Sequence, residues 1–216
     1  PVIYVMTHDS IGVGEDGPTH QPMEQLVMMR SLPNVNVFRP CDGRETAAAY
    51  ISAFTAKKPT VIVESRQNLP AYENTGLQAL KGAYVLDDCK GQPDVLLIAT
   101  GSEVELCMDA KKLLEADGIK ARVISMPCME LFEAQSEEYR DSVIPKNVKA
   151  RVCVEAASHY SWYKYCRDYG ELVTMTSFGT SGPAKQLFEY FGFTAANVAA
   201  KAKLSIENVK LDRASH

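Results

Sequence analysis

Residues 2–22 read Val-Ile-Tyr-Val-Met-Thr-His-Asp-Ser-Ile-Gly-Val-Gly-Glu-Asp-Gly-Pro-Thr-His-Gln-Pro, an apolar run that changes abruptly into a polar loop. The apolar, partly β-branched residues Val2–Met6 predict a buried strand. The polar stretch Thr7–Pro22 begins where that strand ends. In parallel α/β sheets, ligands collect at the carboxyl ends of the strands. This stretch therefore indicates both a fold class and the edge at which to look for a site.

Strand-like and helix-like patterns alternate after this loop. Helices are predicted at Met23–Arg30 and Arg44–Ala56, and strands at Asn34–Phe38 and Thr60–Ser65. Such alternation is typical of a doubly wound parallel sheet. A domain rarely opens on a core strand without a lead-in, and residue 1 is Pro, not Met. We therefore expect residues 1–66 to be the closing part of such a sheet, with its first strands missing.

A second α/β pattern follows residues 67–92, which we interpret as a linker that ends in an edge strand near Ala83–Leu86. Residues 93–216 are expected to form a smaller three-layer α/β domain. Its strands are predicted at Asp94–Thr100, Ala121–Met126, Ala150–Ala156 and Leu172–Thr176, and its helices at Glu103–Ala116, Leu131–Val143, Trp162–Tyr169, Pro183–Tyr190 and from Ala195 onward.

The composition is that of a globular protein. The 216 residues are 46% hydrophobic and 23% charged, with a net charge of −4, which disfavours nucleic acid or an anionic membrane as a partner. Six cysteines without a CxxC pair indicate buried free thiols and a reducing, cytoplasmic location. No apolar run approaches the ~18 residues of a membrane span.

The loop Thr7–Pro22 is the strongest candidate site. His8, Asp16 and His20 together offer positive charge, a carboxylate and groups that can move protons. Arg66 follows the strand Thr60–Ser65, so it is expected at the same sheet edge, where a guanidinium can bind phosphate through two hydrogen bonds. The alternative is a solvated loop with incidental histidines and an arginine that merely ends a strand.

Two serines are expected to have only structural roles. Ser102, with Glu105 three residues later, fits a capping box at the start of a helix. Ser181 fits the N-cap of the helix predicted at Pro183–Tyr190.

At these residues the chain resembles the transketolase family. The stretch THDSIGVGEDGPTHQP is similar to the signature of that family's pyrimidine-binding domain. Further similar motifs follow in order: RPCD at Arg39–Asp42, SRQNL at Ser65–Leu69, ATGSEVEL at Ala99–Leu106, SMP at Ser125–Pro127, WYKY at Trp162–Tyr165 and LFE-x-FGFT at Leu187–Thr194.

The resemblance implies that the chain contains the end of a pyrimidine-binding domain and a C-terminal domain. It also implies a homodimer that binds thiamine diphosphate between subunits, with Mg or Ca joining the diphosphate to a domain outside this chain, and no metal ligand here. His8 and Arg66 match positions that bind the phosphate of the sugar, and Asp16 matches the acid that contacts the substrate's α-hydroxyl. His20 matches a histidine close to the reactive centre, in contact with the cofactor's aminopyrimidine.

The resemblance also implies that the chain alone is inactive, because the glutamate that activates the cofactor and the metal–diphosphate motif are not found in it. Two stretches, Ala157–His159 and Thr180–Gly182, depart from the family's pattern, and because both are expected in the C-terminal domain they leave the assignment of the catalytic residues unchanged. The alternatives are another thiamine-diphosphate enzyme, such as deoxyxylulose-phosphate synthase or dihydroxyacetone synthase, the small subunit of a two-chain transketolase, or a non-catalytic α/β interaction module.

Overall fold

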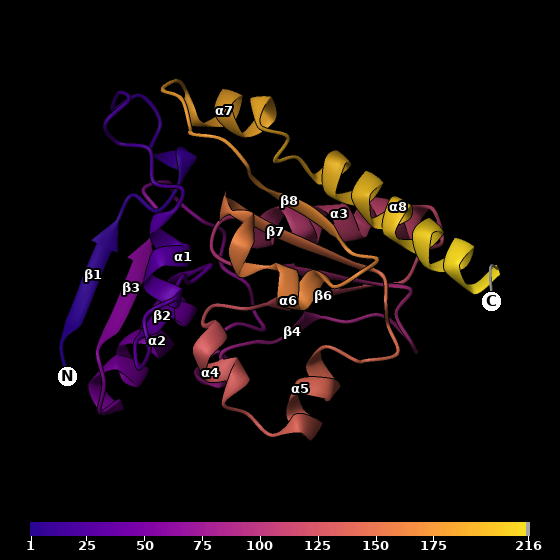
Figure 1. Ribbon diagram of the computed structural model, residues 1–216, viewed down its shortest axis with the longest axis horizontal. Helices are drawn as coiled ribbons and strands as arrows, with labels where there is room; N and C mark the ends of the chain where they lie inside the picture. Colours follow the sequence, from indigo (N-terminus) through magenta and orange to yellow (C-terminus); the bar gives the residue numbers. More distant parts are fainter. Residues whose placement is uncertain (215–216) are drawn as a thin grey trace.

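The computed structural model describes residues 1–214 and contains two β-sheets, each with helices packed against it (Figure 1). The first sheet has three parallel strands in the order β1-β3-β2. These are β1 (Ile3–Thr7), β2 (Asn36–Phe38) and β3 (Thr60–Glu64), joined by the 3-10 turn η1 (Ile11–Val13), α1 (Gln25–Arg30) and α2 (Gly43–Thr55).

Strand β3 is the centre of the first sheet and is buried on both faces. Side chains on successive residues of a strand point to opposite faces. Val61 and Val63 pack with Leu26 of α1, whereas Ile62 packs with Ala49 and Ala53 of α2. Helices on both faces of a parallel sheet confirm the doubly wound pattern predicted from the sequence.

The second sheet has five strands in the order β4-β6-β5-β7-β8. All neighbours are parallel except the edge strand β4, which is antiparallel to β6. The strands are β4 (Tyr84–Asp87), β5 (Val95–Ala99), β6 (Ala121–Ser125), β7 (Arg151–Ser158) and β8 (Glu171–Met175). The antiparallel edge follows η2 (Leu77–Lys81), in the segment where the sequence predicted an edge strand.

Helices cover both faces of this sheet, so the second unit has three layers. One face packs against α3 (Glu103–Ala116) and α8 (Ala195–Ala214). The other packs against α4 (Met129–Glu133), α5 (Glu137–Val143) and α6 (Tyr163–Cys166), the last preceded by η3 (His159–Ser161). The α/β fold class is thereby confirmed, and α7 (Ala184–Tyr190) reaches beyond the sheet toward η1 (Figure 1).

Three local predictions are wrong. Val2–Met6 was predicted to be a buried strand, but β1 lies at the sheet edge and four of its five residues are exposed. The stretch Leu131–Val143 is not one helix but two, because Ser136 interrupts it and caps α5 by accepting a hydrogen bond from the amide of Tyr139. Ser102 makes no capping bond at the start of α3. Its hydroxyl instead donates to the carboxylate of Glu103, so the capping box with Glu105 does not form.

The cysteines behave as the composition predicted. Within residues 1–214 all six are free thiols, and all are buried except the half-buried Cys89. No helix in this described part is both long enough and apolar enough to cross a membrane.

Candidate functional site

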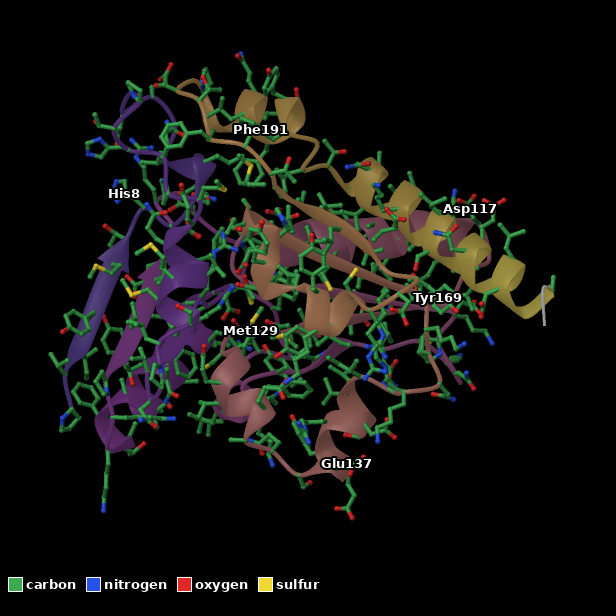
Figure 2. All side chains as sticks on the ribbon, in the orientation of Figure 1. His8, Asp117, Met129, Glu137, Tyr169 and Phe191 are labelled. Atoms are coloured by element: carbon green, nitrogen blue, oxygen red, sulfur yellow. The ribbon has the colours of Figure 1, made fainter. Side chains whose placement is uncertain are left out.

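The loop that follows β1 begins with a strained residue. His8 has a φ of 66°, a left-handed conformation that is uncommon for any residue other than glycine. Its side chain is exposed, and its ring nitrogen Nδ1 lies 2.8 Å from the hydroxyl of Thr7 (Figure 2). Such strain persists only where the surroundings hold it, and it concentrates at functional sites.

The strand pairing brings His8 and Arg66 to the same edge of the first sheet. Thr7, the last residue of β1, pairs with Glu64, the last residue of β3. His8 is thus one residue and Arg66 two residues beyond a shared register position on neighbouring strands, which lie about 4.8 Å apart. The two strands lie side by side, as the predicted site requires. Convergence of the two side chains stays a prediction.

A cavity of about 300 Å³ opens at this edge of the sheet. Its lining includes Glu64, Ser65 and Gln67 after β3 and residues between β2 and the start of α2, but neither Arg66 nor His8. Parallel sheets place ligand sites at the carboxyl ends of their strands, so the cavity has the position expected of a small-molecule site.

The other two predicted site residues lie further along the loop. Asp16 and His20 are both exposed, and Nδ1 of His20 lies 2.9 Å from the hydroxyl of Thr19. Gly17 stands between them with a φ of 88°, and its carbonyl accepts a hydrogen bond from the amide of His20 at 3.3 Å. The turn therefore sets the spacing of the carboxylate and the imidazole.

The second domain touches this loop. The hydroxyl of Ser181 accepts a hydrogen bond from the amide of Gly17 at 3.1 Å, and the amide of Gly182 donates to the carbonyl of Gly14 at 3.2 Å. The residue before α7 is Pro183, and no side chain caps that helix. Ser181 is therefore a contact of the loop and not an N-cap, and the stretch Thr180–Gly182 is not remote from the predicted site.

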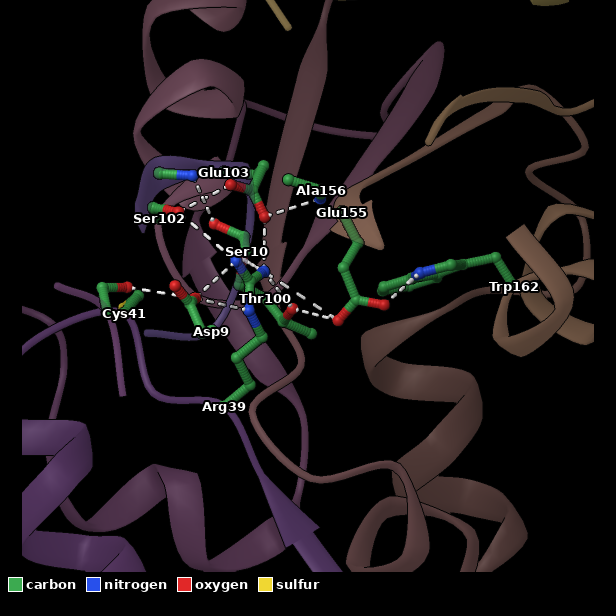
Figure 3. A network of polar contacts seen from close by, with 12 residues as sticks. Asp9, Ser10, Arg39, Cys41, Thr100, Ser102, Glu103, Glu155, Ala156 and Trp162 are labelled. Atoms are coloured by element: carbon green, nitrogen blue, oxygen red, sulfur yellow. Dashed lines mark hydrogen bonds and ion pairs between the residues drawn. The ribbon is translucent and has the colours of Figure 1, made fainter. Parts of the chain in front are cut away.

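A buried ion cluster lies directly beneath the start of the loop (Figure 3). Asp9, next to His8, is almost fully buried and forms a salt bridge of 2.7 Å with Arg39, which follows β2. The hydroxyl of Ser65 donates to the same carboxylate oxygen of Asp9 at 3.1 Å. The residues after all three strands of the first sheet are thus tied together at one point.

Arg39 also reaches into the second domain. Its guanidinium forms an ion pair with Glu103, the first residue of α3, and donates to the carbonyl of Thr100 at 3.1 Å. Gly101 has a φ of 53°, and any side chain there would come within 2.7 Å of the guanidinium. A glycine is therefore required at this position for the cluster to close.

Glu155 of β7 completes the cluster from the other side. Arg30 of α1 donates to both of its carboxylate oxygens at 2.8 Å, and the indole of Trp162 donates at 2.8 Å. Burial alone would raise the pKa of Glu155, but Arg30, Arg39 and the hydroxyl of Thr100 outweigh it and lower the pKa to about 2. The ion pair between Arg30 and Glu155 joins the two domains at a position from which water is excluded.

Sequence reasoning missed the residues of this cluster. One signal was available, because Glu155 is a charged residue inside the strand that was predicted to be buried at Ala150–Ala156. Buried carboxylates are almost always paired. Its partners Arg30 and Arg39 lie more than 100 residues away, and no local pattern identifies them.

The described residues contain no group of three or more His, Cys, Asp or Glu side chains that could hold a metal ion. The candidate site is thus a loop with two imidazoles, a carboxylate and a nearby guanidinium. These groups suit an anionic, hydroxyl-bearing organic ligand.

Comparisons with known proteins find relatives that match most of the chain. The model of the transketolase pyrimidine-binding domain matches residues 1–71, and that of the transketolase-like C-terminal domain matches residues 82–194. The chain is 53% identical over 205 residues to transketolase 1 of Escherichia coli, which covers 93% of this chain and 31% of that protein.

Solved structures give the same result. A crystal structure of a transketolase mutant from Pichia stipitis superposes with a TM-score of 0.92 at 45% identity, over 97% of this chain and 31% of that one. Another from the same organism, in complex with xylulose 5-phosphate, gives a TM-score of 0.89 at 45% identity, over 94% of this chain and 30% of that one. The chain spans about a third of the length of the relatives it matches.

Proposed function

The chain belongs to the transketolase family, and on that premise we propose that it contributes to the transfer of a two-carbon ketol unit from a ketose phosphate to an aldose phosphate in the pentose phosphate pathway. The observation that best supports this proposal is the register of β1 and β3. It brings the residues after both strands, His8 and Arg66, to one edge of the sheet.

His8 and Arg66 are the proposed phosphate ligands. Arg66 is exposed, and within residues 1–214 no carboxylate lies within salt-bridge distance of it, so its charge is available to an anion. A guanidinium binds phosphate through two parallel hydrogen bonds, and the imidazole of His8 can add a third donor. A Pichia stipitis relative has been solved with a phosphorylated ketose, which supports the same substrate class here.

Asp16 and His20 are proposed to act nearer the reacting carbon atoms. The carboxylate of Asp16 can accept a hydrogen bond from the substrate's α-hydroxyl and so select its configuration. In His20, Nδ1 is engaged with Thr19, so Nε2 is the ring nitrogen left for the substrate. Proton transfer at a substrate oxygen requires such an imidazole within hydrogen-bond reach.

Thiamine diphosphate is the proposed cofactor, and when bound it supplies the electron sink for breaking and forming the carbon–carbon bond. The exposed His20 fits a contact with its aminopyrimidine, because Nε2 can donate or accept. The described residues do not fit the metal ion that accompanies the diphosphate. We propose that Mg or Ca is held by parts of the family's fold that this chain does not match.

Three further points belong to the same proposal. Residues 1–66 form the end of a pyrimidine-binding domain, residues 67–92 a linker with an edge strand, and residues 93–216 the C-terminal domain. The working enzyme is a homodimer. The buried free thiols fit a reducing compartment, and the proposed location is the cytoplasm.

The test is a chimera in which residues 1–216 replace the matching part of E. coli transketolase 1. The chimera is assayed with xylulose 5-phosphate and ribose 5-phosphate in the presence of thiamine diphosphate and Mg. Ketol transfer by the chimera is expected, and none by the 216-residue chain alone. A folded, dimeric chimera without activity, in parallel with an active E. coli control, would contradict the proposed function.

A further inference from the structure

We propose that Ser181, in the second domain, is a positioning residue that holds Asp16 in place and thereby sets the preference for an acceptor with a hydroxyl at C2. The inference rests on the proposed function. It assigns to the C-terminal domain a part in substrate selection, through a hydrogen bond that spans 164 positions of the sequence.

The contact is made at the peptide that follows Asp16. The amide of Gly17 belongs to the peptide plane that joins Asp16 to Gly17, and it donates to the hydroxyl of Ser181 at 3.1 Å. Fixing this plane fixes the backbone of Asp16 on its carboxyl side, because a peptide unit is rigid. The direction in which the carboxylate of Asp16 leaves the chain depends on this plane.

The next peptide plane is fixed as well. The side chain of Gln21 donates to the carbonyl of Gly17 at 3.1 Å, and the amide of His20 donates to the same carbonyl at 3.3 Å. Gly17 has a φ of 88°, and nothing lies within 4 Å of the position that a β-carbon would occupy. A glycine with such freedom would sample several conformations unless both planes were held.

The second domain also leaves the space that the side chain of Gln21 occupies. Gln21 is buried, and a side chain on Gly179 would come within 2.4 Å of its Oε1. Gly179 therefore allows Gln21 to reach Gly17. Just before α7, the amide of Gly182 also donates to the carbonyl of Gly14. Figure 1 shows that α7 lies alongside the loop after β1. The loop is thus bonded at Gly14 and Gly17 to one segment of the second domain, which also leaves room for Gln21.

This arrangement supports Asp16 separately from the phosphate-binding end of the site. The start of the loop at His8 is fixed by the ion cluster of Asp9 and Arg39. The part that carries Asp16 is fixed by Ser181. Loss of the Ser181 hydroxyl should therefore affect recognition of the C2 hydroxyl without affecting the phosphate.

The first test measures the contact itself in the 216-residue chain. In Ser181→Ala, amide exchange at Gly17 is expected to be at least threefold faster, whereas exchange in β5 stays unchanged. Thr180→Ala is the matched control, because Thr180 is the exposed neighbour and its side chain makes no hydrogen bond to the described part of the loop. Unchanged exchange at Gly17 in Ser181→Ala would overturn the proposal, whether or not any activity is found.

The second test uses the chimera with ribose 5-phosphate and 2-deoxyribose 5-phosphate as acceptors. Ser181→Ala should lower the ratio of kcat/KM for the two acceptors by about threefold to tenfold, the range expected for one neutral hydrogen bond. Ser181→Thr keeps the hydroxyl and should restore the ratio, and Thr180→Ala should leave it unchanged. An equal loss on both acceptors would mean that Ser181 is only structural and would refute the inference. An inactive parent chimera would instead refute the proposed function.

Discussion

Arg66 lies just beyond the end of β3, and from this position we predict that it binds the phosphate of the substrate. Arg66 is exposed at the edge where His8 also emerges. In the chimera, Arg66→Ala should raise KM for phosphorylated sugars roughly 10- to 100-fold, because hydrogen bonds to a charged group are lost. The phosphate is remote from the bond that breaks, so kcat should change little.

The matched control for Arg66 is Lys57→Ala, which removes the same charge from the loop before β3, at the opposite end of the strand. It should leave KM unchanged. Unphosphorylated sugars provide the second comparison, since they have no phosphate to lose. Equal damage by Arg66→Ala to phosphorylated and unphosphorylated sugars would exclude the phosphate role.

Replacing His20 is expected to lower kcat, in contrast to Arg66→Ala, which should raise KM. Its ring is exposed, with Nδ1 engaged by Thr19 and Nε2 left for the substrate. His20→Ala in the chimera should lower kcat by about 10²- to 10⁴-fold, the typical contribution of a positioned proton donor or acceptor. His8→Ala should mainly raise KM, and so serves as the control. A change confined to KM in His20→Ala would argue against a role in proton transfer.

At the residue scale, a local sequence pattern identifies candidate site residues but not the residues that support them. His8, Asp16 and His20 stand together in one stretch, so a local pattern identifies them. Ser181 was misinterpreted because a serine before a helix usually caps it. Its real partner, the amide of Gly17, is distant in sequence. Only the folded chain brings such pairs together.

Strand β1 is the element with the least support in the described part of the chain. It pairs with β3 along one edge only, and Tyr4, Val5 and Met6 are each more than 40% exposed. By contrast, β5 is paired on both sides and fully buried. Unpaired strand edges and exposed apolar side chains lower local stability.

Amide exchange should reveal this difference between elements. In the monomeric 216-residue chain, the β1 amides that do not bond to β3 are expected to exchange at least 100-fold faster than those of Val95–Ile98. Amides of β3, which has neighbours on both sides, should be protected and act as the internal control. Equal protection of β1 and β5 in a sample shown to be monomeric would contradict this expectation.

Element boundaries followed the periodicity of the sequence where helices and strands were long. The predicted helix Glu103–Ala116 agrees with α3, and the predicted strand Thr60–Ser65 ends within one residue of β3. The prediction failed at Leu131–Val143, where apolar spacing continues through a break. A single cap at Ser136 restarts the helix there, and such a cap outweighs the hydrophobic pattern over a short distance.

For the molecule as a whole, two buried polar clusters join the sheets. One is the ion cluster around Arg39. In the other, Glu45 of α2 accepts hydrogen bonds from Tyr84 of β4 at 2.7 Å and from Ser125 of β6 at 2.5 Å. Burial raises the pKa of Glu45 despite these two bonds. Because both clusters lie between the sheets, we infer that the two domains unfold together.

The ion cluster makes this joint stability depend on pH. The folded pKa of Glu155 is about 2, below its ordinary value of 4.5. A carboxylate with a depressed folded pKa stabilises the fold above its unfolded pKa, and this contribution is lost as the pH falls from about 5 toward 2. For a shift of this size the contribution is on the order of 3 kcal/mol.

Glu155→Gln should therefore destabilise the chain at pH 7, because Arg30 and Arg39 lose a buried counter-charge, a loss that costs on the order of 3 kcal/mol or more. The free energies of unfolding of variant and parent, measured by urea at several pH values, should converge as the pH falls below 5. Glu207→Gln, at an exposed position on α8, is the control and should stay within about 0.5 kcal/mol of the parent at pH 7. A difference between Glu155→Gln and the parent that stayed constant from pH 7 to 3 would mean that Glu155 is not the charged partner of the two arginines.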